Sequence, residues 1–192
     1  GNTIAETVAG AAEFGHDYIA ITDHATGPGM VVRVGIVDET LREQLAEVDG
    51  VAAEADIDVF SGVEANIGED GRISVADDVL AELDLVVASP HAALDGDGTD
   101  RLVAAANHPE VDIIGHPTGQ YLNRRSGLDI DVERLATAAA EAGTALEVNA
   151  SPARLDLDGY AIQAAIEAGA TIAVDTDAHS PGSFAQITYG IH

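Results

Sequence analysis

The chain has 192 residues, with 34 acidic residues against eight arginines, no lysine and a formal net charge of −26. It contains no cysteine, which excludes disulfides and thiolate ligands, so any metal must be held by imidazole and carboxylate groups. The excess of acidic residues argues against a basic surface that binds nucleic acid. The length suits one domain with a continuous core.

Helical and strand-like segments alternate along the whole chain. Thr3 and Glu6 form a capping-box pattern before a helix that ends at Gly15. Apolar spacing predicts further helices at 41–55, after 74, at 102–106, from 129 or 131 to 142, and at 160–168. Short apolar runs predict strands at 18–21, 57–62, 83–88, 111–114, 144–148 and 171–174. This alternation predicts a single α/β domain with a parallel sheet, either open or closed into a barrel.

The distribution of charge and of apolar residues bears on where the protein works. The chain shows no basic-then-apolar leader and no apolar run near the roughly 18 residues of a membrane span, which predicts a cytoplasmic protein with no membrane partner. The acidic residues are spread through the predicted helices, so we interpret them as a solvated surface. Salt screens such a surface, which suggests a halophilic protein.

Candidate functional residues follow the predicted strands. They are His24, Glu64, His91, His116, Asp177 and His179. The carboxyl ends of parallel strands share one rim, where binding and catalytic groups gather. A lone histidine after a strand is more often structural than a ligand, but four on one rim with two carboxylates predict a metal site.

The ligand types restrict the metal. Imidazole with carboxylate suits Zn, Mn or Fe, whereas Mg or Ca would prefer nearly all oxygen ligands. Six candidates exceed the needs of one tetrahedral ion, so we expect at least two ions, with Glu64 as a bridging ligand. Two ions about 3.5–4 Å apart can hold a phosphate and activate a water molecule.

Other polar residues receive structural interpretations. His16, His108 and His192 lie away from the predicted rim or at the chain end, and we do not expect them to bind metal. Asp23 and Asp175 are expected to orient neighbouring histidines or loop backbone. The Gly27-Pro28-Gly29 segment is interpreted as a turn.

Arg124 and Arg125 are candidates for contact with substrate phosphate. They lie together in the loop after His116, on the same rim as the predicted ligands, in a chain that has few basic residues. Arg154 is a weaker candidate, with pairing to Asp156 or Asp158 as the alternative.

The motifs, taken in order, resemble those of the PHP (polymerase and histidinol phosphatase) superfamily. They are Thr22-Asp23-His24, Gly62-Val63-Glu64, Ser89-Pro90-His91, Gly115-His116-Pro117 and Asp175-Thr176-Asp177-Ala178-His179. The segments from Gly115 to Arg125, Leu146 to Ala150 and Arg154 to Leu157 are similar to the PHP domain of bacterial and archaeal family X DNA polymerases. The resemblance covers essentially the whole chain.

This resemblance implies a distorted seven-stranded (β/α)7 TIM-like barrel with two to three divalent metals, Mn or Zn, with Fe as a further candidate. It implies catalytic roles for Glu64, His91, His116 and Asp177. The implied metal sites are Glu64 with His91 and His116, Glu64 with Asp177, and His24 with His179. The implied activity is a Mn-stimulated 3′–5′ exonuclease that acts on DNA 3′ ends in repair, beside an upstream polymerase domain of the same chain.

The sequence departs from the family pattern at its beginning. The opening strand that ends in His-x-His has no counterpart, and the segment from Ile187 to His192 looks short of a final helix. We therefore expect residues 1–192 to be one PHP domain truncated at both ends, lacking the first strand, with weak or no activity by itself. Two other functions remain open: a stand-alone phosphomonoesterase of the histidinol-phosphatase type with a small phosphorylated substrate, and a non-catalytic structural PHP domain.

Overall fold

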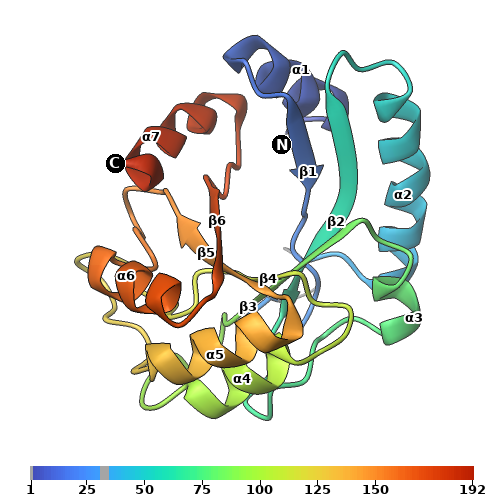
Figure 1. Ribbon diagram of the computed structural model, residues 1–192. Helices are drawn as coiled ribbons and strands as arrows, with labels where there is room; N and C mark the ends of the chain where they lie inside the picture. Colours follow the sequence, from blue (N-terminus) through green and yellow to red (C-terminus); the bar gives the residue numbers. More distant parts are fainter. Residues whose placement is uncertain (1, 31–34) are drawn as a thin grey trace.

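A computed structural model describes residues 2–30 and 35–192. Within these residues six parallel strands form one sheet in sequence order, so that each strand pairs with its neighbours along the chain. They are β1 (Tyr18–Ile21), β2 (Asp58–Asn66), β3 (Leu85–Ser89), β4 (Ile113–Ile114), β5 (Ala145–Asn149) and β6 (Thr171–Asp175). The sheet curls into a half-barrel with helices along its outside (Figure 1), which confirms the predicted α/β barrel type.

The helices alternate with the strands as the sequence predicts. They are α1 (Ile4–Phe14), α2 (Asp38–Ala52), α3 (Asp77–Leu80), α4 (Thr99–Ala106), α5 (Val132–Ala142), α6 (Gly159–Glu167) and α7 (Ile187–Ile191), with a 3₁₀ helix, η1 (Pro181–Gln186), before α7. Several boundaries differ from the predicted ones. For example, α2 begins at Asp38 rather than at Leu41. No helix in the described parts of the chain combines the length and apolar character that a membrane crossing requires.

Local signals explain where the helices begin and end. The backbone N–H of Thr3 donates to Glu6 Oε2 over 2.9 Å, and the N–H of Glu6 donates to Thr3 Oγ1 over 3.1 Å, so the predicted capping box is confirmed. Gly15 ends α1 with φ 97° and Gly143 ends α5 with φ 83°, a left-handed conformation that glycine adopts without steric cost.

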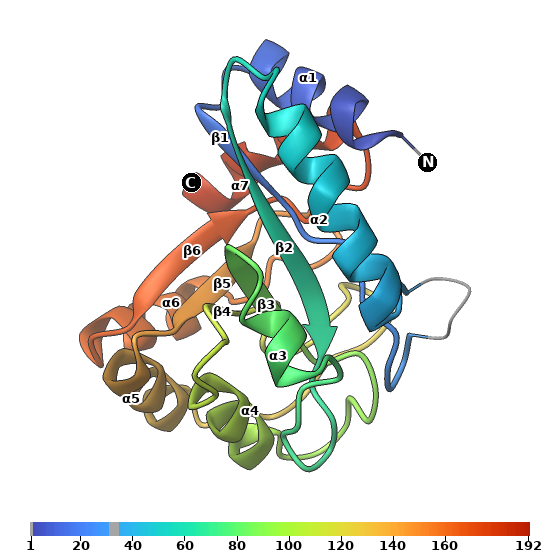
Figure 2. The ribbon, with the colours of Figure 1, turned by 90° about the vertical axis from the view of Figure 1, so that its right-hand side faces the viewer.

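The core is built from aliphatic residues in two parts. The larger part lies between β2–β6 and helices α3–α6, and includes the fully buried Leu102, Ile114, Leu135 and Leu146. A smaller part, with Val8, Ile21 and Val48 at its centre, lies where α1 and α2 cover β1 and β2 (Figure 2). The fold therefore uses the Ala, Val, Ile and Leu content of the chain in place of aromatic residues.

The two ends of the strand order, β1 and β6, are connected by helix contacts. The ring of His16, just after α1, lies edge-on to Phe184 of η1, with ring centroids 5.5 Å apart. Gly10 of α1 also packs so closely on Pro181 that a Cβ built there would lie 2.6 Å from the proline Cβ. The C-terminal segment is thereby held against the N-terminal helix.

Strand β2 is longer than the predicted strand. It runs to Asn66, and the sequence analysis ended it at Gly62. Glu64 is thus the seventh residue of a nine-residue strand that is paired along Gly62–Asn66 with β3, rather than a residue of the following loop. This correction matters for the site, because a residue in a paired strand is held more rigidly than one in a loop.

Candidate metal centre

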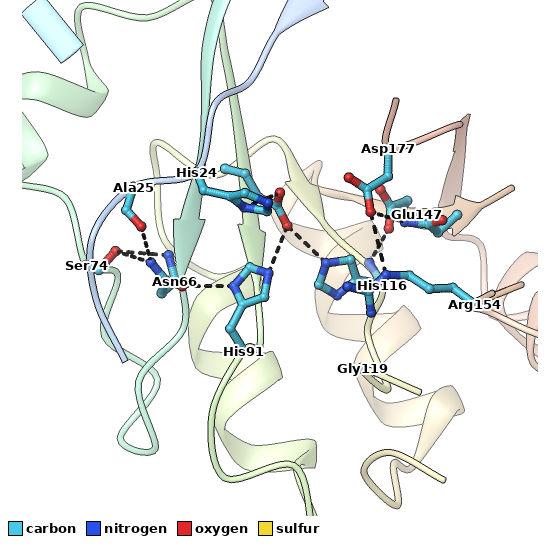
Figure 3. A network of polar contacts seen from close by, with 12 residues as sticks. His24, Ala25, Asn66, Ser74, His91, His116, Gly119, Glu147, Arg154 and Asp177 are labelled. Atoms are coloured by element: carbon cyan, nitrogen blue, oxygen red, sulfur yellow. Dashed lines mark hydrogen bonds and ion pairs between the residues drawn. The ribbon is translucent and has the colours of Figure 1, made fainter. Parts of the chain in front are cut away.

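Four of the predicted ligands meet at the carboxyl ends of β1–β4. Glu64 points from β2, while His91 and His116 lie two residues beyond β3 and β4. His24 lies three residues beyond β1, where its backbone forms an isolated parallel bridge with Glu64. Figure 3 shows the labelled His24, His91 and His116 converging from separate elements.

The two oxygens of the Glu64 carboxylate face different histidines. Oε2 lies 2.8 Å from His24 Nδ1, while Oε1 lies 3.0 Å from His116 Nε2 and 3.3 Å from His91 Nε2. Glu64 and His116 are buried. A carboxylate whose two oxygens serve separate imidazoles has the arrangement expected of a ligand shared between ions.

Ionisation of this cluster follows from its contacts. Burial opposes the charge on Glu64, but its contacts with His116, His24 and His91 outweigh burial and hold its pKa well below the usual range. The contact with Glu64 raises the pKa of His24, whereas burial lowers the pKa of His91. The cluster therefore offers an ionised carboxylate, and His91 favours the neutral form that can ligate metal.

The donor set fits a divalent cation. His24 Nδ1 and His91 Nε2 are buried, and neither makes a well-directed hydrogen bond although both lie close to Glu64. One ligand atom each from His24, Glu64 and His91 lies within 4.8 Å of the other two. Two unsatisfied imidazole nitrogens and a carboxylate converging in this way suit divalent metal ions such as Zn or Mn.

The remaining predicted ligands, Asp177 and His179, form a second group beside the first. Asp177 lies two residues beyond β6, and its Oδ2 accepts a hydrogen bond of 3.2 Å from Asn149 Nδ2. His179 Nδ1 lies 2.8 Å from the Asp177 carbonyl oxygen. The His179 ring is 68% exposed and its centroid lies 5.6 Å from that of His24, so the ring contact joins the two groups.

Two of the predicted ligands have an unusual backbone. His116 has φ 25° and Asp177 has φ 47°, in the left-handed region that side chains other than glycine rarely adopt. Such conformations concentrate at functional sites because the surrounding structure must enforce them. At His116 the backbone N–H donates to the buried Glu147 carboxyl, which helps to fix this conformation.

Glu147, which is buried, and Asp175, which is half-buried, form an acidic pair behind the site. Burial raises the pKa of Glu147 well above its usual range and raises that of Asp175 to about 6. Asp175 Oδ1 also accepts the N–H of Asp177 over 3.1 Å. Asp175 thus holds loop backbone as expected, whereas Asp23 accepts a hydrogen bond from the Gln44 side chain instead of orienting a histidine.

The arginines do not all lie where the sequence suggests. Arg125 donates from Nε and Nη2 to the Gly119 carbonyl over 3.0 and 2.6 Å, while Arg124 is exposed over the Tyr121 ring. The weaker candidate, Arg154, lies nearest the ligands, with Nε 3.5 Å from Asp177 Oδ2 (Figure 3). Neither Asp156 nor Asp158 forms an ion pair with Arg154 in the described residues.

Sequence reasoning missed the polar residues that support the ligands. Asn66 contacts His91 Nδ1 over 2.8 Å, and Glu147 and Asn149 reach His116 and Asp177. Strand alternation could have found them, because Asn66 lies two residues after Glu64 in β2, and Glu147 and Asn149 lie two apart in β5.

The histidines set aside in the sequence analysis have other surroundings. His16 lies between the rings of Phe14 and Phe184, and His108 Nε2 lies 3.4 Å from Asp77 Oδ1.

Gly29 packs against the backbone of His91, where a Cβ would lie 2.4 Å from the carbonyl oxygen. The turn at Gly27–Gly29 therefore lies against the site.

Comparisons with known proteins find relatives along nearly the whole chain. The chain is 40% identical over 182 residues to DNA polymerase/3′-5′ exonuclease PolX of Bacillus subtilis, which covers 93% of this chain and 32% of the polymerase. It is 33% identical over 191 residues to a protein of Shewanella sp. named "Probable phosphatase", and 34% identical over 192 residues to one so named from Caldanaerobacter subterraneus. Each covers 93% of this chain and 70% of the phosphatase. The chain thus spans about a third of the polymerase.

A solved structure shows the same fold. The crystal structure of histidinol phosphate phosphatase from Lactococcus lactis, in complex with zinc, L-histidinol and phosphate, superimposes with a TM-score of 0.62 over 99% of this chain and 86% of that chain. The identity of 16% makes this a likeness of fold alone. A scan against models of protein families finds no match.

Fold, site and relatives together define an α/β phosphoesterase, a hydrolase whose histidine and carboxylate cluster suits divalent metals. The chain belongs to the PHP (polymerase and histidinol phosphatase) superfamily.

Proposed function

We propose that this chain is one PHP domain, residues 1–192, that hydrolyses phosphodiesters with two to three divalent ions, Mn or Zn with Fe as a further candidate. The observation that carries the proposal is the Glu64 carboxylate, whose oxygens lie 2.8–3.3 Å from nitrogens of three histidines. His24, Glu64, His91 and His116 would hold metal at the centre, and Asp177 with His179 would complete it. Divalent ions bound there would supply positive charge to the phosphate and lower the pKa of a water molecule.

The residues of the chain would divide the remaining work. Glu64, His91, His116 and Asp177 are the proposed catalytic residues, since as metal ligands they would surround the reacting phosphate. Asn66 would fix His91, and Asn149 would fix Asp177. Arginine would neutralise charge on the phosphate: Arg154 at the centre, with Arg124 or Arg125 further out.

The 40% identity to PolX across 93% of this chain supports the narrower proposal of a 3′–5′ exonuclease domain of a family X DNA polymerase. In that reading the substrate is a DNA 3′ end met during repair in the cytoplasm, and the polymerase domain lies upstream in the same protein.

A stand-alone phosphomonoesterase is a second candidate. The chain is 33% and 34% identical to two probable phosphatases, along 70% of the length of each. The net charge of −26 also disfavours a long nucleic acid and is compatible with a small phosphorylated substrate. A non-catalytic domain that supports a polymerase is a third candidate, which the intact ligand cluster disfavours.

The test is to measure metal binding and hydrolysis with the same variants. We expect Glu64→Gln to abolish Mn²⁺ binding in calorimetry and Mn²⁺-dependent release of 3′ nucleotides from a DNA oligomer. Glu69→Gln, which changes an exposed acid five residues away, is the matched control and should leave both unchanged. Hydrolysis of a phosphorylated amino alcohol but not of the oligomer would favour the phosphomonoesterase. Unaltered metal binding and rate in Glu64→Gln would refute the metal-dependent mechanism.

A further inference from the structure

Six of the seven described arginines fall into two groups, while the seventh, Arg101, is buried and donates from Nη1 to the Ala92 carbonyl oxygen over 3.1 Å. Those on the outer surface pair with nearby acids: Arg42 with Asp78 and Glu82, Arg72 with Asp70, and Arg134 with Asp100, over 2.7–3.0 Å. Arg124, Arg125 and Arg154 instead lie together in the loops after β4 and β5, where the described residues supply a single acid contact, from Arg154 to Asp177 over 3.5 Å. In a chain with 34 acidic residues, three neighbouring arginines that share one acid contact among them form a favourable binding site for an anion.

An aromatic ring holds two of these guanidinium groups. The Cζ of Arg124 lies 5.0 Å from the centroid of the Tyr121 ring, and the Cζ of Arg154 lies 5.8 Å from the same centroid. Both distances are within the range of cation–π attraction. Tyr121 therefore places an exposed arginine of one loop and a mostly buried arginine of another around one ring.

The two loops are tied together by main-chain contacts. Gln120 Nε2 donates to the carbonyl oxygens of Arg154 and Leu155 over 3.0 and 2.9 Å, and the N–H of Leu122 donates to the Ala153 carbonyl over 2.7 Å. The N–H of Tyr121 donates to the Arg125 carbonyl over 2.9 Å, which closes a tight hairpin. The guanidinium groups are thus presented from a joined framework rather than from independent loops.

The group extends outward from the proposed metal centre. Arg154 lies beside Asp177, and its side chain is 15% exposed. The Tyr121 ring contacts Arg154 and also contacts Arg124, which is exposed. Arg125 is committed to the Gly119 carbonyl, so it supports the hairpin. The order from the centre is Asp177, Arg154, Tyr121, Arg124.

We propose that Arg154, Tyr121 and Arg124 form a second-phosphate subsite: Arg154 contacts the phosphate held at the metal centre, and Arg124 contacts the next phosphate of the same substrate. Guanidinium groups bind phosphate through paired N–H donors, and Tyr121 reduces the freedom each arginine loses on binding. The inference rests on the proposed phosphoesterase function and narrows it to substrates that carry at least two phosphates. Two guanidinium groups could bind two phosphates that are separated by a nucleoside or two phosphates that are directly linked.

Binding by the full chain, measured by calorimetry in EDTA so that no hydrolysis occurs, tests whether the arginines themselves distinguish one phosphate from two. The probes are thymidine 5′-monophosphate, thymidine 5′-diphosphate and a 5′-phosphorylated thymidine dinucleotide. We expect the dinucleotide to bind about tenfold more tightly than the monophosphate, since charge-assisted hydrogen bonds are the strong ones. Arg124→Ala should remove this gain and leave monophosphate binding unchanged, whereas Arg134→Ala, which also removes one surface charge, should keep it.

Two substitutions of Tyr121 test whether its ring contributes to the subsite. Tyr121→Leu should lose the gain, and Tyr121→Phe, which retains the ring, should keep it. A gain for the diphosphate instead of the dinucleotide, still dependent on Arg124, would support the subsite and assign it to directly linked phosphates. Equal affinity of the parent chain for all three probes, or a gain that survives Arg124→Ala, overturns the inference. Since no hydrolysis is measured, failure of the proposed activity would appear separately, in the Glu64→Gln comparison.

Discussion

Asn66 and His91 form a contact that fixes which nitrogen of the histidine faces the carboxylate. Asn66 Nδ2 donates to the Ala25 carbonyl over 2.8 Å, which leaves its Oδ1 to accept from His91 Nδ1, also at 2.8 Å. An amide oxygen only accepts, so Nδ1 carries a proton, and in the neutral ring Nε2 is then the nitrogen left free to ligate metal. The second residue after Glu64 in β2 thereby prepares His91 to ligate metal.

Asn66→Ala should weaken metal binding. Without its acceptor, the His91 ring loses both its preferred tautomer and its orientation, and changes of this kind typically cost about 10- to 100-fold in metal affinity. Calorimetric titration with Zn²⁺ or Mn²⁺ measures the effect. Asn107→Ala, at an exposed helix end, is the matched control. An affinity within twofold of the parent would show that the contact does not prepare the ligand.

Metal should stabilise the fold. An ion that binds the folded chain alone adds about 2.7 kcal/mol to the free energy of unfolding at a hundredfold excess over its Kd. For a chain of this size that corresponds to a rise in Tm of about 5–10 °C. Thermal melts followed by circular dichroism, with Mn²⁺ or Zn²⁺ and then with EDTA, measure the shift. The shift should disappear in Glu64→Gln, and an equal shift in that variant would mean that the ions bind elsewhere.

Much of the fold is predictable from the sequence because local signals and long-range pattern agree. The capping box at Thr3 and the glycines after α1 and α5 act within a few residues, so they can be identified in isolation. The end of β2 could not be, since the segment from Val63 to Asn66 contains Glu64 and Asn66, and its strand conformation comes from pairing with β3. Tertiary contact overrides the local polarity there.

The site shows the same division. Topology alone brings His24, Glu64, His91 and His116 to one rim, because parallel strands end on the same side. The choice among arginines depends on loop conformation: the hairpin from Tyr121 to Arg125 turns the Arg125 guanidinium onto Gly119, and the following loop brings Arg154 to Asp177. The spacing of residues along the chain does not predict how two loops fold against each other, and so does not predict which arginine reaches the site.

The pair of Glu147 and Asp175 makes the stability of the metal-free chain depend on pH. A carboxyl of an unfolded chain ionises near pH 4, whereas burial raises the pKa of Asp175 to about 6 and raises the pKa of Glu147 well above its usual range. The folded chain favours protonated Asp175, so this contribution is full below about pH 4 and lost as the pH rises to about 6.

Asp175→Asn should therefore become more stable relative to the parent as the pH rises. The isosteric amide cannot ionise but can still accept the N–H of Asp177. Between pH 4 and pH 7 the difference in free energy of unfolding should move in favour of the variant by about 2 kcal/mol. Urea denaturation in EDTA at several pH values gives this difference, with Asp158→Asn at the start of α6 as a control for loss of one carboxylate. A difference that is constant with pH would show that Asp175 does not titrate as burial predicts.

The net charge of −26 should make folding depend on salt. Acids outnumber arginines about fourfold, so bringing them onto one folded surface costs repulsive energy that the expanded chain largely avoids. Salt shortens the Debye length from about 10 Å at 0.1 M to about 3 Å at 1 M, which removes most of that repulsion. We expect the midpoint of urea denaturation to rise steadily from 0.1 to 2 M KCl. Glu43 and Glu47 of α2 are exposed and form no ion pair with any other described residue. Replacing both with glutamine should raise the midpoint at 0.1 M but have little effect at 2 M. If the low-salt chain were as stable as the high-salt chain, repulsion between surface carboxylates would not limit this fold, and the expectation of a halophilic protein would lose its physical basis.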